Sequence, residues 1–85
     1  TQLVNNVKKF LNDEHIPYEK VEIIENRTVY IKLAQGEEIL VTPEKDILNQ
    51  IRSLQLTINH FTIEGKKISR VDFRFEKPVI TLRDK

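Results

Sequence analysis

The sequence predicts an α+β domain in which a helix, a three-stranded antiparallel meander, a second helix and a closing β-hairpin follow one another along the chain. Apolar residues recur every three or four positions in residues 3–11 and 47–58, which is the spacing of helices with one buried face. They alternate with polar residues in residues 20–23, 28–33 and 68–75, which is the pattern of half-buried strands. We therefore expect both helices to pack on one side of a largely antiparallel sheet.

Size and composition indicate one small globular domain spanning residues 1–85. The 39% hydrophobic content is too high for a disordered chain, and the 32% charged residues interrupt every run long enough to cross a membrane. Fourteen basic residues against 13 acidic ones leave a net charge of +1, which removes the main sequence argument for a nucleic-acid or anionic-membrane binder. Because the chain begins at Thr1 and contains no methionine, we expect it to be a domain cut from a longer protein.

The first half of the chain should form the first helix and the start of the meander. The helix should run over residues 3–11 and end near Asn12, because Pro17 lacks an amide donor and disfavours a helical residue before it. A strand over residues 20–23 and a tight turn then lead into residues 28–33. One face of this second strand should carry Val29, Ile31 and Leu33.

The middle of the chain should complete the meander and form the second helix. Gly36 can adopt a positive φ at little cost, so residues 37–41 should form the third strand. Thr42 and Pro43 should start the helix, since a hydroxyl can cap free amides and proline loses nothing at the first helical position. The helix should extend to about Asn59, with an apolar stripe made of Ile47, Leu48, Ile51, Leu54 and Ile58.

The closing hairpin should join a strand over residues 68–75 to a short strand over residues 79–82. One face of the longer strand should carry Val71, Phe73 and Phe75, and the other Arg70, Asp72 and Arg74. The shorter strand is apolar on both faces and free of charge from Pro78 to Leu82. Such a strand needs a partner along its backbone, inside the molecule or outside it.

Two interpretations of this last strand follow from its residues. It is either an edge that binds another protein by strand addition, or a strand buried between two neighbours, which would also be apolar on both faces. Pro78 favours the edge, because proline is tolerated at the start of a strand and seldom in a central ladder. For Phe75, a partner contact and a place in the core remain equally open. The candidate partner-binding residues are Phe75, Pro78, Val79, Ile80, Thr81 and Leu82.

The charged residues around the hairpin give weaker signals. Asp72 and Arg74 lie two residues apart on one strand face, and a solvated charge pair of small energetic weight is the simplest interpretation. A loose basic group would suit acidic side chains on a partner, although such residues usually serve only as a soluble surface. This group consists of Lys66, Lys67, Arg70 and Lys77.

No catalytic constellation occurs in the sequence. It contains no nucleophile elbow, phosphate-binding loop or paired-carboxylate motif, and turn solvation explains Glu37 and Glu38 beside the glycine. His15 and His60 have no carboxylate at metal-ligand spacing, and the absence of cysteine excludes disulfides and thiolate metal sites. We therefore expect a protein that is not an enzyme and that uses no metal and no cofactor.

Taken in order, these segments resemble the membrane-distal β domain of the FtsQ/DivIB family of bacterial cell-division proteins, over nearly the whole chain. Residues 33–41, Leu-Ala-Gln-Gly-Glu-Glu-Ile-Leu-Val, resemble the family's glycine-containing hairpin, and residues 46–54, Asp-Ile-Leu-Asn-Gln-Ile-Arg-Ser-Leu, its leucine-spaced helix. Residues 71–75, Val-Asp-Phe-Arg-Phe, resemble its hydrophobic-Asp-Leu-Arg-aromatic strand, with phenylalanine in place of leucine. Gln50 departs from the family, in which lysine is frequent at that position. The resemblance rests on the order and spacing of these pieces.

The resemblance implies a single-pass bacterial membrane protein with this domain on the extracytoplasmic side, and with a tail, a membrane helix and a POTRA domain before Thr1. The family is a non-enzymatic scaffold of the division machinery that binds FtsB and FtsL, or DivIC and FtsL in Gram-positive relatives, and helps regulate septal peptidoglycan synthesis. In its Gram-negative branch the partner adds a strand to the segment that corresponds to residues 78–82 here. Phe75 lies where the family carries an aromatic residue implicated in partner binding.

Two other classes of function compete with this scaffold. A small nucleic-acid-binding α+β module would stack bases on Tyr30, Phe73 and Phe75 and hold phosphates with its basic residues. The net charge near zero argues against it. A hydrolase fragment would need a catalytic constellation that the sequence lacks.

Overall fold

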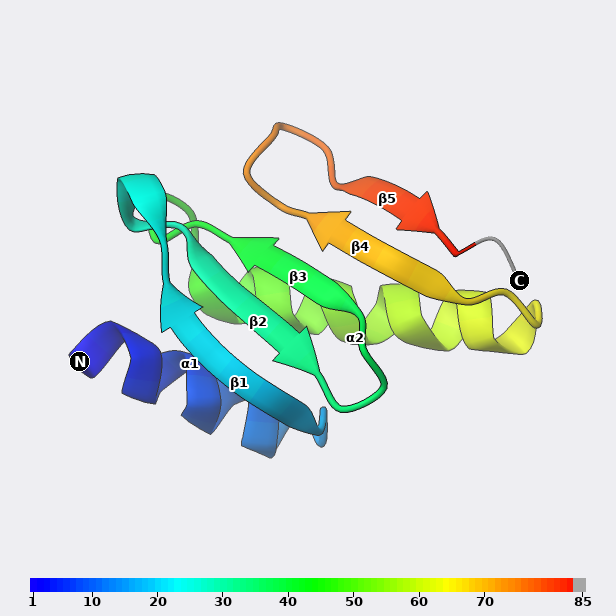
Figure 1. Cartoon of the computed structure of the whole chain (residues 1–85), viewed down its shortest axis with the longest axis horizontal. Helices are drawn as coiled ribbons and strands as arrows, with labels where there is room; N and C mark the ends of the chain where they lie inside the picture. The colour runs from blue at the N-terminus through cyan, green and yellow to red at the C-terminus, as the bar shows by residue number, and fades with distance from the viewer. Residues whose placement is uncertain (84–85) are drawn as a thin grey trace.

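The computed structural model describes residues 1–83 and shows a five-stranded mixed sheet with two helices behind it (Figure 1). The strands lie in the order β1-β2-β3-β4-β5 across the sheet. The elements in chain order are α1 (Gln2–Asp13), β1 (Tyr18–Ile23), the short 3-10 helix η1 (Glu25–Arg27), β2 (Val29–Leu33), β3 (Glu38–Val41), α2 (Ile47–Ile63), β4 (Ile68–Asp72) and β5 (Val79–Leu82). The predicted α+β class is confirmed.

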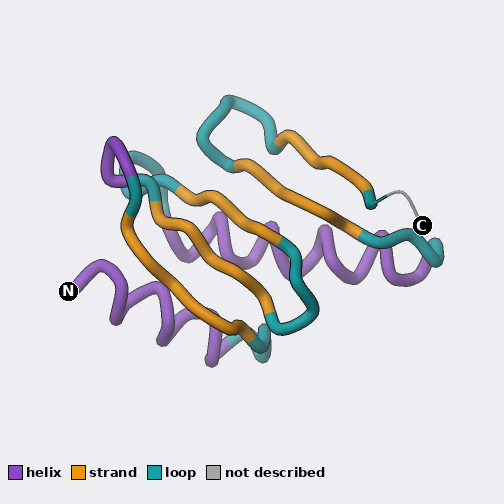
Figure 2. Tube along the Cα trace, viewed as in Figure 1, coloured by secondary structure: helices purple, strands orange, loops and turns teal. Residues whose placement is uncertain are grey.

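The sheet combines antiparallel and parallel pairings. β1 with β2, β2 with β3, and β4 with β5 are antiparallel, whereas β3 and β4 run parallel. The parallel pair arises because α2 carries the chain back behind the sheet between these two strands (Figure 2). In its register Ile39 lies opposite Val71, and both side chains are fully buried. The three-stranded meander β1–β3 and the hairpin β4–β5 are therefore joined through the β3–β4 pair in the centre of the sheet.

Helix α1 is bounded by side-chain and backbone caps at its two ends. The Thr1 hydroxyl accepts a hydrogen bond from the Val4 amide at 3.3 Å. At the other end the Ile16 amide donates to the Leu11 carbonyl and the His15 amide to the Asn12 carbonyl, the two bonds of a Schellman motif. His15 takes the left-handed position at φ 59°, which glycine more often occupies. The predicted helix end near Asn12 is thus reached one turn before Pro17.

The meander follows the alternation in the sequence. Val29, Ile31 and Leu33 of β2 are all buried, as their shared face predicts. The β1–β2 turn places Asn26 and Arg27 at positive φ. Gly36 has φ 102° in the β2–β3 turn, a conformation that L side chains rarely adopt.

The second helix begins later than Thr42 and Pro43 predict. Its N-cap is Asp46, whose carboxylate accepts from the Asn49 amide at 3.1 Å. The Thr42 hydroxyl does cap an amide, that of Glu44 at 3.2 Å, but this bond closes a turn before the helix. The prediction that the Thr42 hydroxyl caps a free amide is therefore correct, but the capped amide belongs to the preceding turn and not to α2.

The second helix also ends later, at Ile63 instead of Asn59. Gly65 at φ 72° closes it, with the Lys66 amide donating to the Phe61 carbonyl at 2.9 Å. Phe61 and Ile63 belong to the last turns of α2. The positive φ of Gly65, and not the end of the apolar stripe, sets the C-terminal end of α2.

The core lies between the sheet and the two helices. Helix α1 contributes Val7 and Leu11, and α2 contributes Ile51 and Leu54, all fully buried. Ile47 and Ile58 of the predicted stripe are partly buried against this core. The strands and the residue that follows β4 contribute Val21, Val29, Ile31, Leu33, Ile39, Val41, Ile68, Val71 and Phe73.

Gln50 is a buried polar residue that closes the connection between β3 and α2. Its side-chain oxygen accepts from the Thr42 amide at 3.0 Å, and its side-chain nitrogen donates to the Thr42 carbonyl at 2.8 Å. The same nitrogen lies 3.4 Å from the Lys45 carbonyl oxygen. One amide side chain thus satisfies backbone groups that would otherwise be buried without partners.

Replacing Gln50 by leucine should lower the free energy of unfolding by about 1–3 kcal/mol, because the backbone amide of buried Thr42 loses its partner and the Thr42 carbonyl keeps only the 3.4 Å bond from the Lys45 amide. Urea unfolding followed by circular dichroism measures this change. Gln55→Leu, at a half-exposed position of the same helix, is the matched control and should change stability by less than about 1 kcal/mol. Equal effects of the two substitutions would contradict the role given to Gln50.

Candidate functional site

The candidate site is the free edge that β5 forms at one side of the sheet. β5 pairs with β4 alone among the described strands, and all four of its residues are exposed. Val79 exposes 50% of its surface and Leu82 39%, which is unusual for apolar residues in a strand. The interpretation of this segment as a strand buried between two neighbours is therefore wrong, and Pro78 stands immediately before an edge strand.

The backbone of β5 presents alternate amides to the outside. The Arg83 amide donates to the Lys67 carbonyl at 2.8 Å, so Arg83 faces β4. In an antiparallel ladder the backbone groups of successive residues point alternately toward and away from the partner. Thr81 and Val79 therefore also face β4, whereas the N–H and C=O groups of Ile80 and Leu82 point away from the sheet.

The side chains of β5 divide between two faces. Ile80 lies opposite Val71 and Leu82 opposite Ile68, and both of those β4 residues are buried. Ile80 and Leu82 therefore stand on the helix-covered face of the sheet, where they extend the core beyond its last covered strand. Val79 and Thr81 stand on the opposite, open face.

Phe75 is exposed, so the alternative that placed it in the core is wrong. β4 ends at Asp72, and the chain bends through residues 74–77 instead of continuing as a strand. Phe73 still follows the predicted face and is buried, but Phe75 exposes 55% of its surface. It belongs to residues 73–78, which loop from β4 to β5 (Figure 1).

Asp72 and Arg74 form a tighter pair than the sequence suggests. The Arg74 guanidinium donates to both Asp72 oxygens, with the shortest N–O distance 2.7 Å, and the Arg74 amide donates to the same carboxylate at 3.0 Å. Asp72 is buried, so the expectation of a fully solvated pair was wrong for its acidic member. Hydrogen bonds from the Arg74 side chain are the main cause that lowers the pKa of Asp72 below its ordinary value.

The opposite edge of the sheet, β1, has features that block the addition of another strand. It carries Glu19, Lys20 and Glu22, of which the last two form an ion pair at 3.1 Å. Its register shifts between Tyr18 and Lys20, and α1 packs against it. Charges, irregular pairing and covering helices are the ordinary means by which proteins block edge strands. β5 has no charged residue along its length.

The open face of the sheet carries a small polar network. The Tyr30 hydroxyl donates to Glu38 at 2.8 Å, and Arg70 donates to the other oxygen of Glu38 at 3.2 Å. The bond to Glu38 raises the pKa of Tyr30, and the bonds from Tyr30 and Arg70 lower that of Glu38. Lys66 pairs with Glu64 at 3.5 Å. Two members of the predicted basic group are therefore engaged with carboxylates.

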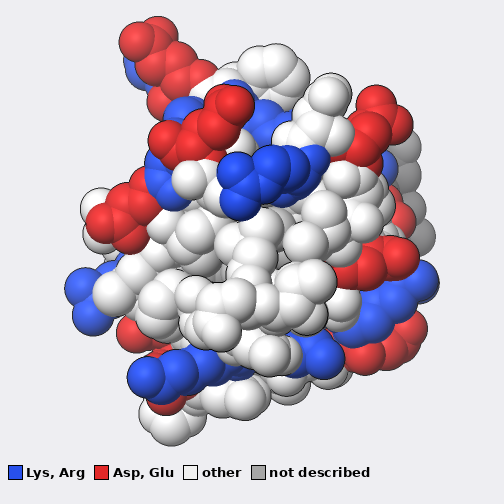
Figure 3. All heavy atoms as spheres, turned by 90° about the vertical axis from the view of Figure 1, so that its left-hand side faces the viewer, with Lys and Arg blue, Asp and Glu red and all other residues white. Residues whose placement is uncertain are grey.

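Charges of both signs are mixed on the end of the molecule that lies on the left in Figure 1. Figure 3 shows acidic and basic side chains around an uncharged centre on this end. The exposed apolar residues Ile23 and Ile24 belong to this region, where β1 meets η1. This end therefore offers no continuous positive surface to a phosphate backbone.

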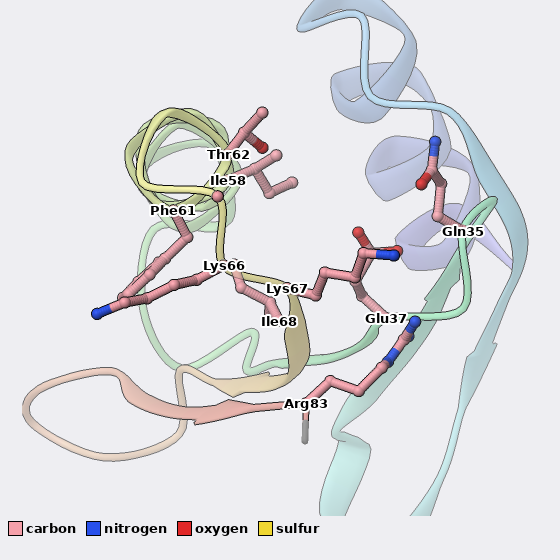
Figure 4. Close-up of a pocket in the computed structure, with 10 residues that line it drawn as sticks. Gln35, Glu37, Ile58, Phe61, Thr62, Lys66, Lys67, Ile68 and Arg83 are labelled. Carbon is pink, nitrogen blue, oxygen red and sulfur yellow. The ribbon is translucent and has the colours of Figure 1, made fainter. Parts of the chain in front are cut away.

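A pocket of about 280 Å³ lies between the C-terminal half of α2, the β2–β3 turn and the start of β4. Ile58, Phe61 and Ile68 form its apolar wall, and Lys67 and Arg83 reach toward Glu37 on the other side (Figure 4). One carboxylate oxygen of Glu37 is buried without a hydrogen-bond partner among the described residues. This arrangement provides neither a nucleophile nor a base with an orienting partner.

Metal-ligating residues do not converge in the described part of the chain. No group of three or more His, Asp or Glu side chains that would hold a metal ion occurs among residues 1–83. His60 instead lies 3.3 Å from Glu64, one turn along α2.

No family model matches this chain, and no curated protein matches it. Within the described residues, neither helix has the length and apolar character needed to span a membrane.

Asp72→Asn should destabilise the domain by about 1 kcal/mol at pH 7, a value kept small because Arg74 is partly exposed. The pKa of Asp72 is lower in the folded state, so its carboxylate stabilises the fold above the unfolded-state pKa of about 3.9. This contribution is lost as the pH falls through the folded-state pKa.

The difference in urea midpoint between wild type and Asp72→Asn should therefore be constant from about pH 7 to pH 5 and should close below about pH 4. Asp13→Asn, at an exposed position at the end of α1, provides the comparison. A difference for Asp72→Asn that does not change with pH would show that the carboxylate charge contributes nothing.

Proposed function

We propose that this chain is the extracytoplasmic β domain of an FtsQ/DivIB-like division protein, anchored as a single-pass protein in the bacterial cell membrane. In this proposal it is a non-enzymatic scaffold in septum formation that binds FtsB/DivIC-like and FtsL-like partners by strand addition to β5. The observation that carries the proposal is the uncharged edge strand with outward-facing amides at one side of the sheet. The order of segments that resembles the family supplies the identity of the partners.

Strand addition at β5 has a definite chemistry. The outward N–H and C=O groups of Ile80 and Leu82 supply main-chain hydrogen bonds to an added strand. Their side chains stand on the helix-covered face, so apolar residues at alternate positions of the added strand would continue the core over them. Affinity then comes from the backbone, and specificity from these apolar contacts and from Phe75 nearby.

The difference between the two sheet edges supports β5 as the docking side. Both edge pairs contain a register shift, but β1 has charged side chains and a packed helix, whereas β5 has only uncharged, mostly apolar side chains from Val79 to Leu82. A monomeric domain under selection against aggregation blocks its edges, so an unblocked one indicates a partner.

The nucleic-acid alternative finds less support among its proposed contact residues. Phe73 is buried in the core, and the Tyr30 hydroxyl and Arg70 are both bonded to Glu38. Phe75 is left as the single exposed aromatic of the three that the alternative requires. One exposed ring is a poor platform for single-stranded bases, which stack in succession on several aromatic side chains.

Ile80→Pro should weaken binding to the extracytoplasmic segment of an FtsB-like protein from the same organism by at least about tenfold, measured by isothermal titration calorimetry. The substitution removes an amide that points away from β4, so the bonds that Val79 and Thr81 make to β4 remain. The thermal midpoint should therefore shift by only a few degrees.

The matched control is Ile23→Pro on the opposite edge, where the Ile24 amide donates to the Thr28 carbonyl and the amide of Ile23 therefore points outward. Binding should survive this change. If Ile80→Pro binds as tightly as wild type, strand addition at β5 is wrong. Tight binding of single-stranded nucleic acid with a steep salt dependence, in place of the division partner, would support the alternative module.

A further inference from the structure

The loop between β4 and β5 carries an exposed aromatic ring and has no regular hydrogen-bond ladder of its own. Residues 74–77 bend, and the Phe73 amide donates to the Leu40 carbonyl at 2.8 Å, extending the parallel pairing by one bond. Beyond that bond, the β-sheet does not hold the chain until Val79. Phe75, more than half exposed, lies within this stretch.

A single lysine from another part of the chain holds this loop. The Lys45 ammonium donates to the Phe73 carbonyl at 3.2 Å and also to the Phe75 carbonyl. Lysine has three donors and no acceptor, so one side chain can bridge two carbonyls that face the same way. Hydrogen bonds from a charged donor are roughly twice as strong as those between neutral groups. The bridge therefore fixes the backbone on both sides of Arg74.

Lys45 is itself anchored. It lies immediately before the N-cap of α2, its amide lies 3.4 Å from the Thr42 carbonyl oxygen, and its carbonyl oxygen lies 3.4 Å from the Gln50 side-chain nitrogen. Gln50 is buried and closes the β3–α2 connection. The Lys45 ammonium thus extends from a backbone that is fixed at the start of α2. Its bonds to the loop therefore hold the loop in a defined position relative to this helix.

Asp72 provides a second set of hydrogen bonds that hold the loop. Its carboxylate holds both the amide and the guanidinium of Arg74, and that guanidinium lies over the Phe75 ring at 6.0 Å from its centre. Arg74 is thereby held from one side by Asp72, while its two neighbours are held by Lys45 from the other. The loop is shaped by two charged groups, although it lies at the surface.

A hollow of about 240 Å³ depends on this shape. It lies between the loop and the first half of α2, beside the start of β5, and its lining includes Lys45, Asn49, Ser53, Phe75 and Pro78. This volume is below the range of about 300–1,000 Å³ that is typical of small-molecule sites. It therefore suits a contact with part of a protein partner that continues past β5.

We infer that Lys45 is a positioning residue of the docking surface: it holds the β4–β5 loop so that Phe75 and Pro78, the residue immediately before β5, present one preformed surface. This inference rests on the proposed strand addition to β5. A loop that is ordered before binding loses less conformational entropy on association, and the complex gains affinity without any new contact. Lys45 thus acts on the partner through the loop.

The test is Lys45→Met, which keeps the apolar length of the side chain and removes its donors. In the free domain, ¹⁵N relaxation should show backbone order parameters for residues 74–77 falling from about 0.8 to below about 0.6. Affinity for the FtsB-like segment should fall about three- to tenfold, while the thermal midpoint changes by only a few degrees. Lys45→Arg, which restores a charged donor, should recover most of both effects.

Lys77→Met, in the same loop, is the matched control and should change neither order parameters nor affinity. Unchanged order parameters in Lys45→Met would overturn the inference, whether or not any partner binds. A mobile loop with undiminished affinity would also overturn it, because the loop would then lie outside the docking surface. If wild type fails to bind the FtsB-like segment, the proposed function fails, and the relaxation data still decide whether Lys45 orders the loop.

Discussion

The parallel pairing of β3 with β4 is the constraint on which the remaining structure depends. It places Ile39 opposite Val71 in the centre of the core, and it requires α2 to return the chain behind the sheet. Once β4 lies beside β3, a short hairpin can add β5 only on the outside. The exposed edge is therefore a consequence of the topology, and Gln50 secures it indirectly by fixing the point from which α2 departs.

The topology explains why β5 is an edge strand, but it does not explain why the side chains of β5 are mostly apolar and uncharged. The fold necessarily leaves two edges, and only β1 among them carries charged side chains and packs against a helix. The apolar side chains of Ile80 and Leu82 continue the face that α2 covers over the neighbouring strand. An added strand would thus complete an existing apolar surface, a larger gain than pairing backbone groups alone.

Periodicity was sufficient to predict the elements, because burial of one face imposes it on each of them. The alternation of Val29, Ile31 and Leu33 and the apolar stripe of α2 follow directly from contact with the core. Element boundaries were harder to predict, because they depend on local bonds that compete with each other. Thr42 carries the residue type of a helix cap, but its hydroxyl serves a preceding turn, and Asp46 takes the capping role.

The same competition explains why the sequence left the exposure of Phe75 open. Alternation from Val71 places Phe73 and Phe75 on the buried face, and it holds only while the backbone remains extended. At Arg74 the amide bonds to the Asp72 carboxylate at 3.0 Å and leaves the strand ladder. The strand therefore ends at Asp72, three residues before its pattern does, and Phe75 is exposed. The sequence predicts Asp72 and Arg74 to be a solvated charge pair. Because their contact ends the strand, it leaves the Phe75 side chain exposed on the candidate docking surface.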